Sequence, residues 1–216
     1  RLRLAGHPDV QVADLDMTFP ADGGGESLER SLDDIFRKAE AAIAGGATIL
    51  VLTDRAVGPL RAPIPALLSV AGLHHHLIRA GLRNHAGIIL EGGEPREVMH
   101  FALLFAYGAN AACPTTALAT IRELAESGLL EVLVTPAQAL DNYITAVKKG
   151  LLKTFSRMGI STLRSFFGSQ IFEAVGIGEK VIERYFTGTP SRIGGVVAHV
   201  HFEENQRVEA GQLLAE

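Results

Sequence analysis

The chain has 216 residues, of which 47% are hydrophobic and 20% charged, a profile typical of a packed globular protein rather than a disordered one. Its 20 lysines and arginines against 24 aspartates and glutamates give a net charge of −4, which removes the electrostatic attraction to nucleic acids and anionic membranes. The single cysteine, Cys113, cannot by itself form an intrachain disulfide, a multi-cysteine zinc site or an iron–sulfur cluster. No apolar run reaches the roughly 18 residues that span a bilayer, so we expect a soluble, cytoplasmic α/β chain.

Short apolar runs typical of β-strands alternate with helical stripes through residue 127. Strands are predicted at residues 10–16, 48–52, 87–90 and 110–113. Helices are predicted at residues 28–44, 64–80, 94–106 and 115–127, the first of them after Ser27 as N-cap. Four consecutive βα units imply right-handed crossovers and a parallel sheet. The periodicity leaves open whether this sheet is open or curls toward a barrel, but a complete eight-fold barrel takes about 250 residues and more strands.

Beyond residue 127 the pattern changes to longer helices and loops. The elements predicted there are a helix at 137–157, an extended piece at 159–162, helical segments at 170–174 and 179–186, and a loop at 187–195. From residue 196 the alternating run VVAHVHF, followed by a polar turn, predicts a short C-terminal β hairpin-like tail. We therefore divide the chain near residue 195, into residues 1–195 and a tail at 196–216.

Several residues that directly follow or end predicted strands are candidates for a functional site. Asp54 and Arg55 follow the second strand, Glu91 follows the third, and Cys113 ends the fourth. Ligands of parallel α/β folds bind at the carboxyl ends of strands, so these positions are where a site is expected. The alternative for the charged residues is helix capping and ion pairing between loops. A lone cysteine with no base beside it in sequence is typical of a small buried residue.

A basic stripe lies on the long predicted helix, on a different face from its apolar residues. Lys149, Lys153 and Arg157 recur at four-residue spacing, and this spacing places them on one side of a helix. Such a stripe suits a phosphate or an acidic partner surface. The alternative is a solvated helix face, the common role of charges opposite an apolar stripe.

Two groups of histidines have the composition of metal ligands but not the geometry. His74, His75 and His76 are adjacent, and consecutive helical residues project about 100° apart, so the three rings do not converge on one ion. Glu97 and His100 have the E-x-x-H spacing of di-iron bundles, which need a second such helix and two more glutamates. We expect hydrogen-bonded packing residues in both places, and no metal site.

Several long stretches, in this order, closely resemble the central domain of the large subunit of glutamate synthase. They are TILVLTDR (48–55), APIPALLSVAGLHHHLIRAGLRN (62–84), GEPREVMHFALLFAYGANAACP (93–114), NYITAVKKGLLKTFSRMGISTLRSFFGSQIFEAVGI (142–177) and YFTGTPSRIGG (185–195). The resemblance covers about residues 12–195, most of the chain. Motifs of this length in this order rarely arise by chance.

The resemblance implies an oxidoreductase of nitrogen assimilation that makes glutamate from glutamine and 2-oxoglutarate. In that family an amidotransferase domain releases ammonia, and an FMN-binding β/α barrel beside a 3Fe–4S cluster performs the reduction. The central domain lies between them as an incomplete, rudimentary version of the parallel barrel, with extra helices and without the cofactor. No catalytic, cofactor-binding or metal-binding residue of the family is carried onto this chain, so the role implied is to connect the two centres and shield migrating ammonia. The electron donor, whether NADPH, NADH or ferredoxin and with or without a small donor subunit, stays open.

The tail at residues 196–216 departs from that family. It resembles half of a biotinyl/lipoyl-like hairpin of membrane-fusion adaptor proteins, with Gly211 at the turn. Two alternative functions therefore remain. One is a free-standing, non-catalytic βα scaffold or fusion remnant, and the other is a small-molecule βα enzyme that uses Asp54, Glu91 and Lys149 at the mouth of the sheet.

Overall fold

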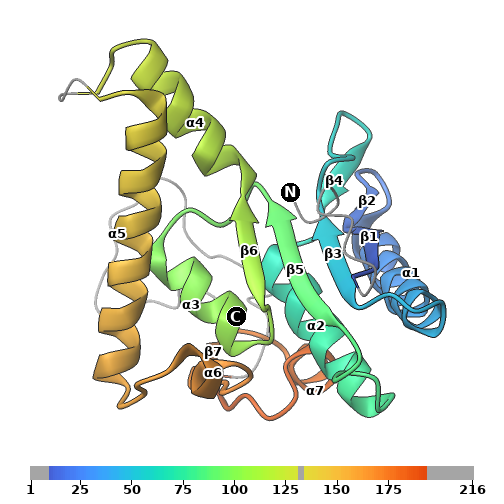
Figure 1. The fold of residues 1–216 in the computed structure, drawn as a ribbon. Coiled ribbons are helices and arrows are strands. Elements are labelled where there is room, and N and C mark those ends of the chain that lie inside the picture. The colour runs from blue at the N-terminus through green and yellow to red at the C-terminus, as the bar shows by residue number, and fades with distance from the viewer. Residues whose placement is uncertain (1–9, 131–133, 194–216) are drawn as a thin grey trace, which may run out of the picture.

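A parallel sheet of four strands forms the centre of the molecule (Figure 1). The computed structural model describes residues 10–130 and 134–193. The sheet contains β1 (Val12–Asp16), β3 (Ile49–Thr53), β5 (Gly87–Gly92) and β6 (Ala111–Pro114), in that order. Every neighbouring pair in it is parallel, which confirms the predicted α/β fold class with its incomplete series of βα units.

Three helices connect these strands: α1 (Gly24–Ala44), α2 (Ala66–Arg79) and α3 (Val98–Ala106). The strand order follows the chain order, so successive right-handed crossovers put the three helices on the same face of the sheet. Side chains alternate between the two faces of a strand, and one row of this face consists of Leu15, Leu52 and Leu90, each at most 2% exposed. These leucines belong to the core that also contains Leu32 and Leu73 of the helices.

Further elements lie at the two ends of the sheet. Above the carboxyl ends of the strands in Figure 1 lie the antiparallel pair β2 (Thr18–Pro20) and β4 (Arg61–Pro63) on one side and α4 (Thr115–Glu126) on the other. The long helix α5 (Pro136–Arg157) packs against α3 and α4. Near the amino ends lie α6 (Leu163–Phe166), α7 (Glu179–Tyr185) and the parallel pair β7 (Ala174–Val175) and β8 (Ser191–Ile193). No helix of the described segments is both long and apolar enough to cross a membrane.

Three sequence-based details are wrong. The first helix begins at Gly24 after Gly23 as N-cap, and Ser27, the predicted cap, is buried in its first turn. The segment predicted as helical at 170–174 is not a helix, because Gln170 has a positive φ of 49° and the chain then extends into β7. The predicted loop at 187–195 contains β8. The hairpin-like tail predicted at 196–216 lies outside the described residues.

Candidate ligand pocket at the carboxyl ends of the strands

The strand ends align in one row on the face of the sheet opposite the helical core. The register places Asp16 beside Thr53, Thr53 beside Glu91, and Glu91 beside Cys113. The candidates Glu91 and Cys113 therefore come together, as expected for parallel strands that end at the same edge.

Arg55 reaches across from the end of β3 to Glu91. Its Nε donates a hydrogen bond to Glu91 Oε1 at 2.9 Å, and its NH2 group donates to the same oxygen. The hydrogen bond and the charge of Glu91 raise the pKa of Arg55 above its ordinary value. Cys113 is exposed rather than buried as the sequence suggested, because it lies at the end of the edge strand β6. Partial burial of its thiol, and then the Glu91 carboxylate, still raise its pKa, so this cysteine is not an activated thiolate. This is the ion pair that the sequence left open as the alternative to a site, but Glu91 lies inside β5 rather than in the loop after it.

The side chain of Asp54 bonds to the loop that follows β5. Its Oδ2 accepts a hydrogen bond from the backbone N–H of Gly93 at 2.7 Å. One residue further on, Glu94 Oε2 accepts the N–H of Ala66 at 2.6 Å. Ala66 is the first residue of α2, and the N-cap Pro65 has no side chain that accepts a hydrogen bond. Glu94 therefore supplies the negative partner that a helix N-terminus favours.

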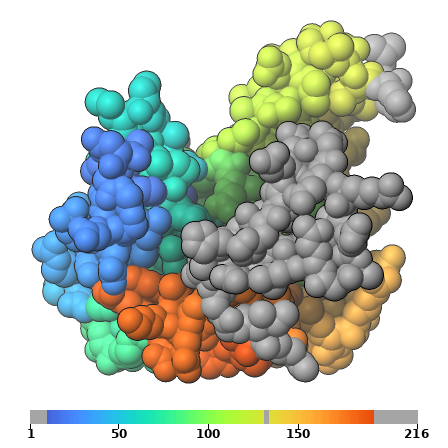
Figure 2. All heavy atoms as spheres, turned by 180° about the vertical axis from the view of Figure 1, so that it is seen from behind, coloured from blue at the N-terminus to red at the C-terminus, as the bar shows by residue number. Residues whose placement is uncertain are grey.

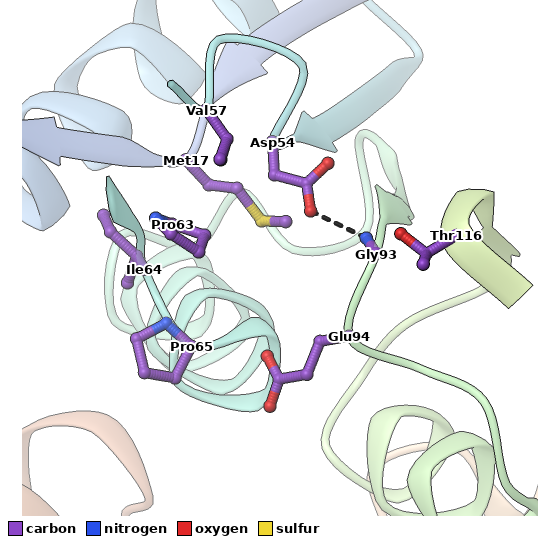
Figure 3. Close-up of a pocket in the computed structure, with 9 residues that line it drawn as sticks. All are labelled: Met17, Asp54, Val57, Pro63, Ile64, Pro65, Gly93, Glu94 and Thr116. Atoms are coloured by element: carbon purple, nitrogen blue, oxygen red, sulfur yellow. Dashed lines mark hydrogen bonds between the residues drawn. The ribbon is translucent and has the colours of Figure 1, made fainter. Parts of the chain in front are cut away.

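Asp54 and Glu94 both line a pocket of about 510 Å³ (Figure 3). The lining residues are Met17, Asp54, Val57, Pro63, Ile64, Pro65, Gly93, Glu94 and Thr116. Figure 3 shows the apolar side chains on one side of the pocket and the carboxylates with Thr116 on the other. From behind, the molecule is hollowed between the teal β3–β4 segment and the yellow-green α4, and lining residues come from both sides of this hollow (Figure 2).

Sequence reasoning found Asp54 but missed Glu94. The signal available was the sequence Ile64-Pro65-Ala66 at the start of a predicted helix, because a proline at the N-cap leaves the first N–H groups without a local acceptor. Nothing in one sequence says which distant carboxylate fills that need.

The basic residues of α5 do not join the strand-end residues. Lys149, Lys153 and Arg157 are exposed on α5, whose opposite side buries Leu151 and Phe155. In Figure 1, α5 lies along the left edge, beyond α3 and β6 and away from β3. The proposed grouping of Asp54, Glu91 and Lys149 is therefore not assembled here: Asp54 lines the pocket, Glu91 pairs with Arg55, and Lys149 lies on α5.

The three adjacent histidines diverge to three different partners, as predicted. His74 Nδ1 accepts a hydrogen bond from Arg83 Nε at 2.8 Å, His75 Nε2 lies 2.6 Å from the Gln170 amide, and His76 Nε2 lies 2.6 Å from Glu40 Oε1. Burial, followed by the charge of Arg83 and then of His75, lowers the pKa of His74 to about 4. Among the residues that the structure describes, no three histidine, cysteine or acidic side chains are placed to hold a metal ion.

The E-x-x-H sequence is a helix cap. His100 Nδ1 accepts the backbone N–H groups of Arg96 and Glu97 at 3.2 and 3.3 Å, and the Glu97 side chain completes a capping box at the start of α3. The spacing that resembles a metal motif thus satisfies backbone donors instead.

The comparisons with known proteins decide the family. The family model described as "Glutamate synthase central domain" matches residues 1–178. The chain belongs to the glutamate synthase central-domain family. The chain is 45% identical over 206 residues to the glutamate synthase [NADPH] large chain of Bacillus subtilis, a match that covers 95% of this chain and 13% of that relative.

Relatives with other electron donors match equally broadly. The ferredoxin-dependent glutamate synthase 2 of a Synechocystis species is 44% identical over 200 residues, covering 87% of this chain and 13% of the relative. The glutamate synthase [NADH] of Saccharomyces cerevisiae is 40% identical over 198 residues, covering 89% of this chain and 9% of the relative. The chain therefore spans only about a tenth of the length of these relatives.

A solved structure supports the barrel-like fold. A mutant flavocytochrome b2 with benzoylformate matches with a TM-score of 0.52 and 11% identity, over 82% of this chain and 40% of that structure's chain. At this identity the likeness concerns the fold alone. It fits the prediction of an incomplete parallel β/α barrel.

Proposed function

We propose that the chain is the connecting central domain of a glutamate synthase, the oxidoreductase that makes glutamate from glutamine and 2-oxoglutarate. The observation that carries the proposal is the family match over residues 1–178, in a chain that spans 9–13% of relatives named glutamate synthases. A piece of that size leaves room for separate reaction centres elsewhere in the enzyme. Its own role is to space those centres and to shield migrating ammonia, since protonation to ammonium removes the nucleophilic lone pair.

The partners in this proposal are the amidotransferase and FMN-binding domains of the same enzyme, in the cytoplasm. A small electron-donor subunit or ferredoxin completes the assembly. The relatives include NADPH, NADH and ferredoxin forms of similar identity, so the sequence match does not select among the donors. The boundary near residue 195, with a separate tail at 196–216, remains part of the proposal.

The side chains present do not suit the cofactors expected in the full enzyme. A 3Fe–4S cluster is held by several cysteine thiolates, and the whole sequence has one cysteine. The pocket at the strand ends presents the carboxylates of Asp54 and Glu94, and its lining contains no lysine or arginine from the segments that the structure describes. Such a lining repels the phosphate of FMN. We therefore place FMN and the cluster in the neighbouring FMN-binding domain.

The exposed face of α5 is the surface that we assign to a neighbouring domain. Lys149, Lys153 and Arg157 are exposed there, and Leu152 between them is 63% exposed. Protein interfaces surround apolar contact residues with a polar, solvated rim, and in this proposal Leu152 is the contact residue and the three cations are its rim. In this proposal, contact between this face of α5 and a neighbouring domain keeps water away from the path that ammonia takes between the reaction centres.

The test reverses charge on this face in the enzyme that carries the chain. A Lys149→Glu/Lys153→Glu double variant places like charges opposite an acidic partner surface, which costs several kcal/mol. We expect glutamine hydrolysis to exceed 2-oxoglutarate consumption, with free ammonia released, whereas the parent consumes both in equal molar amounts. Arg30→Glu, on exposed α1 surface, is the matched control.

Two results would contradict the proposal. Unchanged coupling in the double variant would remove α5 from the interface. Glutamate formation by the full chain alone, given glutamine, 2-oxoglutarate and a reductant, would show a catalytic centre inside it and end the connecting role.

A further inference from the structure

The pocket at the carboxyl ends of β3 and β5 plays no part in the connecting role, and its lining has a distinct chemistry (Figure 3). We propose that it binds a small organic cation, an alkylammonium or alkylguanidinium. The charged head lies between the carboxylates of Asp54 and Glu94, and the stem lies on the apolar wall. This inference does not depend on the proposed function.

The polar wall is built from two carboxylates whose orientation is fixed by backbone hydrogen bonds. Asp54 Oδ2 is held by the N–H of Gly93 at 2.7 Å, and Glu94 Oε2 by the N–H of Ala66 at 2.6 Å. A carboxylate offers about four lone-pair positions, so each group keeps acceptor capacity for a ligand. Figure 3 shows both carboxylates at the pocket, with the hydroxyl of Thr116 beside them.

The charge of the lining selects a cation. Among the described residues, the nine that line the pocket include no lysine, arginine or histidine, so within that part of the chain the two carboxylates face no basic side chain in the wall. N–H donors that carry positive charge make the strong hydrogen bonds with carboxylates, and an anionic ligand would be repelled. No third metal-ligating side chain joins them among the described residues, so the pair suits an organic cation rather than a metal ion.

The apolar wall is part of the rigid core. Met17 and Ile64 are at most 1% exposed and belong to the main hydrophobic cluster, while Val57 and Pro63 extend the wall toward solvent. A hydrocarbon stem on the exposed side chains of Val57 and Pro63 removes apolar surface from water. Met17 and Ile64 back this wall from the core.

Two adjacent glycines, Gly92 and Gly93, bring the end of β5 close to the side chains around the pocket. A Cβ at Gly93 would lie 2.5 Å from Thr116 Oγ1, and one at Gly92 would lie 2.9 Å from Met17 Cε. A Cβ at either position would have to displace the end of a neighbouring side chain, so glycine at both positions allows the end of β5 to approach Met17 and Thr116 closely. This close approach brings the backbone N–H of Gly93 next to Asp54 Oδ2. The hydrogen bond between them fixes the orientation of the Asp54 carboxylate at the pocket.

The methionines allow a direct test. The sequence has three, and Met17 lines the pocket while Met99 and Met158 do not. The full chain, labelled with 13C at the methionine methyl groups, is titrated with butylammonium and butylguanidinium, and with butanol as the uncharged control. We expect a saturable shift of the Met17 signal at millimolar cation or below, much weaker binding of butanol, and unmoved Met99 and Met158 signals.

Matched variants then separate charge from shape. Asp54→Asn and Glu94→Gln keep an oxygen acceptor for the Gly93 and Ala66 N–H groups but remove the charge. Each should weaken cation binding about tenfold, equivalent to about 1.4 kcal/mol. Glu126→Gln, an exposed carboxylate at the end of α4, should leave the affinity unchanged.

Other outcomes are equally informative. Equal affinity for butanol and butylammonium, unchanged affinity in both variants, or no Met17 shift would overturn the proposal. An arginine side chain of another polypeptide also carries a guanidinium group. N-acetylargininamide is therefore titrated in a second experiment as a model of such a side chain. Tighter binding of it than of butylguanidinium assigns the occupant to a polypeptide, and weaker binding assigns a free ligand.

Discussion

Arg83 joins three segments through its guanidinium group. It donates hydrogen bonds to the carbonyl of Ala86 at 2.9 Å, the carbonyl of Gly108 at 2.8 Å and the ring Nδ1 of His74 at 2.8 Å. The last contact requires the neutral ring, because a protonated imidazole has no acceptor. Gly108 has φ 108°, and a Cβ there would lie 2.2 Å from His74 Nδ1, so the ring fits only against glycine.

The low pKa of His74 predicts acid sensitivity. Its pKa is about 4 in the folded chain against an ordinary 6.5, so between these values the unfolded state binds more protons. The free energy of unfolding therefore falls as pH drops from about 6.5 to about 4, by at most about 1.4 kcal/mol per pH unit from this group. Urea unfolding of the full chain across this range should show the slope, and His74→Gln, which keeps an acceptor, should reduce it. His75, whose pKa burial also lowers, supplies a residual slope. An unchanged slope in the variant would argue against a neutral His74.

Helices α3 and α5 are in close contact at a glycine. A Cβ at Gly150 would lie 2.4 Å from Val98 Cγ2, and valine has little freedom to turn away. Glycine inside a helix costs about 1 kcal/mol relative to alanine, so its presence in α5 indicates that packing outweighs propensity here.

Gly150→Ala should accordingly destabilise the chain. Overpacking typically costs about 1–3 kcal/mol and exceeds the gain of about 1 kcal/mol in helix propensity. In the double variant with Val98→Ala the clash is removed, so the same substitution should become neutral or stabilising. Thermal unfolding of the four members of this cycle gives the coupling energy. If the two substitutions instead changed the free energy of unfolding additively, the contact between Gly150 and Val98 would not limit the packing of α3 against α5.

The sequence predicted the elements whose signal is local, and less well those set by distant contacts. The four strands were found because apolar runs flanked by glycine and helical stripes have a clear period. The sequence identified which side of α5 is apolar, but not how deeply each residue of that side is buried. Leu151 and Phe155 are buried while Ile144 is 40% exposed, because burial depends on where α3 and α4 lie. At the pocket, the strand-end rule found Asp54, whereas Glu94 depends on a contact 28 residues away along the chain.

For the whole molecule, consecutive βα units explain both the fold and its likeness to a flavoprotein barrel. Four parallel strands in chain order, with the connecting helices on one face, match 82% of the chain to part of that larger structure. Polar side chains collect at the carboxyl ends of the strands, where loops from several units meet. The carboxylates at that edge differ in their partners. Glu91 forms an ion pair with Arg55, whereas Asp54 and Glu94 have no basic side chain beside them among the described residues that line the pocket.

The histidine run has a practical consequence. Three consecutive histidines resemble a short affinity tag, and in an extended peptide they chelate immobilised nickel. In the folded chain their rings are engaged by Arg83, Gln170 and Glu40, and His75 is 7% exposed. Unfolding frees these three rings, so an untagged preparation should adhere to a nickel-charged resin more strongly in urea than in native buffer. Chromatographic retention would then report how much of a sample has lost its native structure.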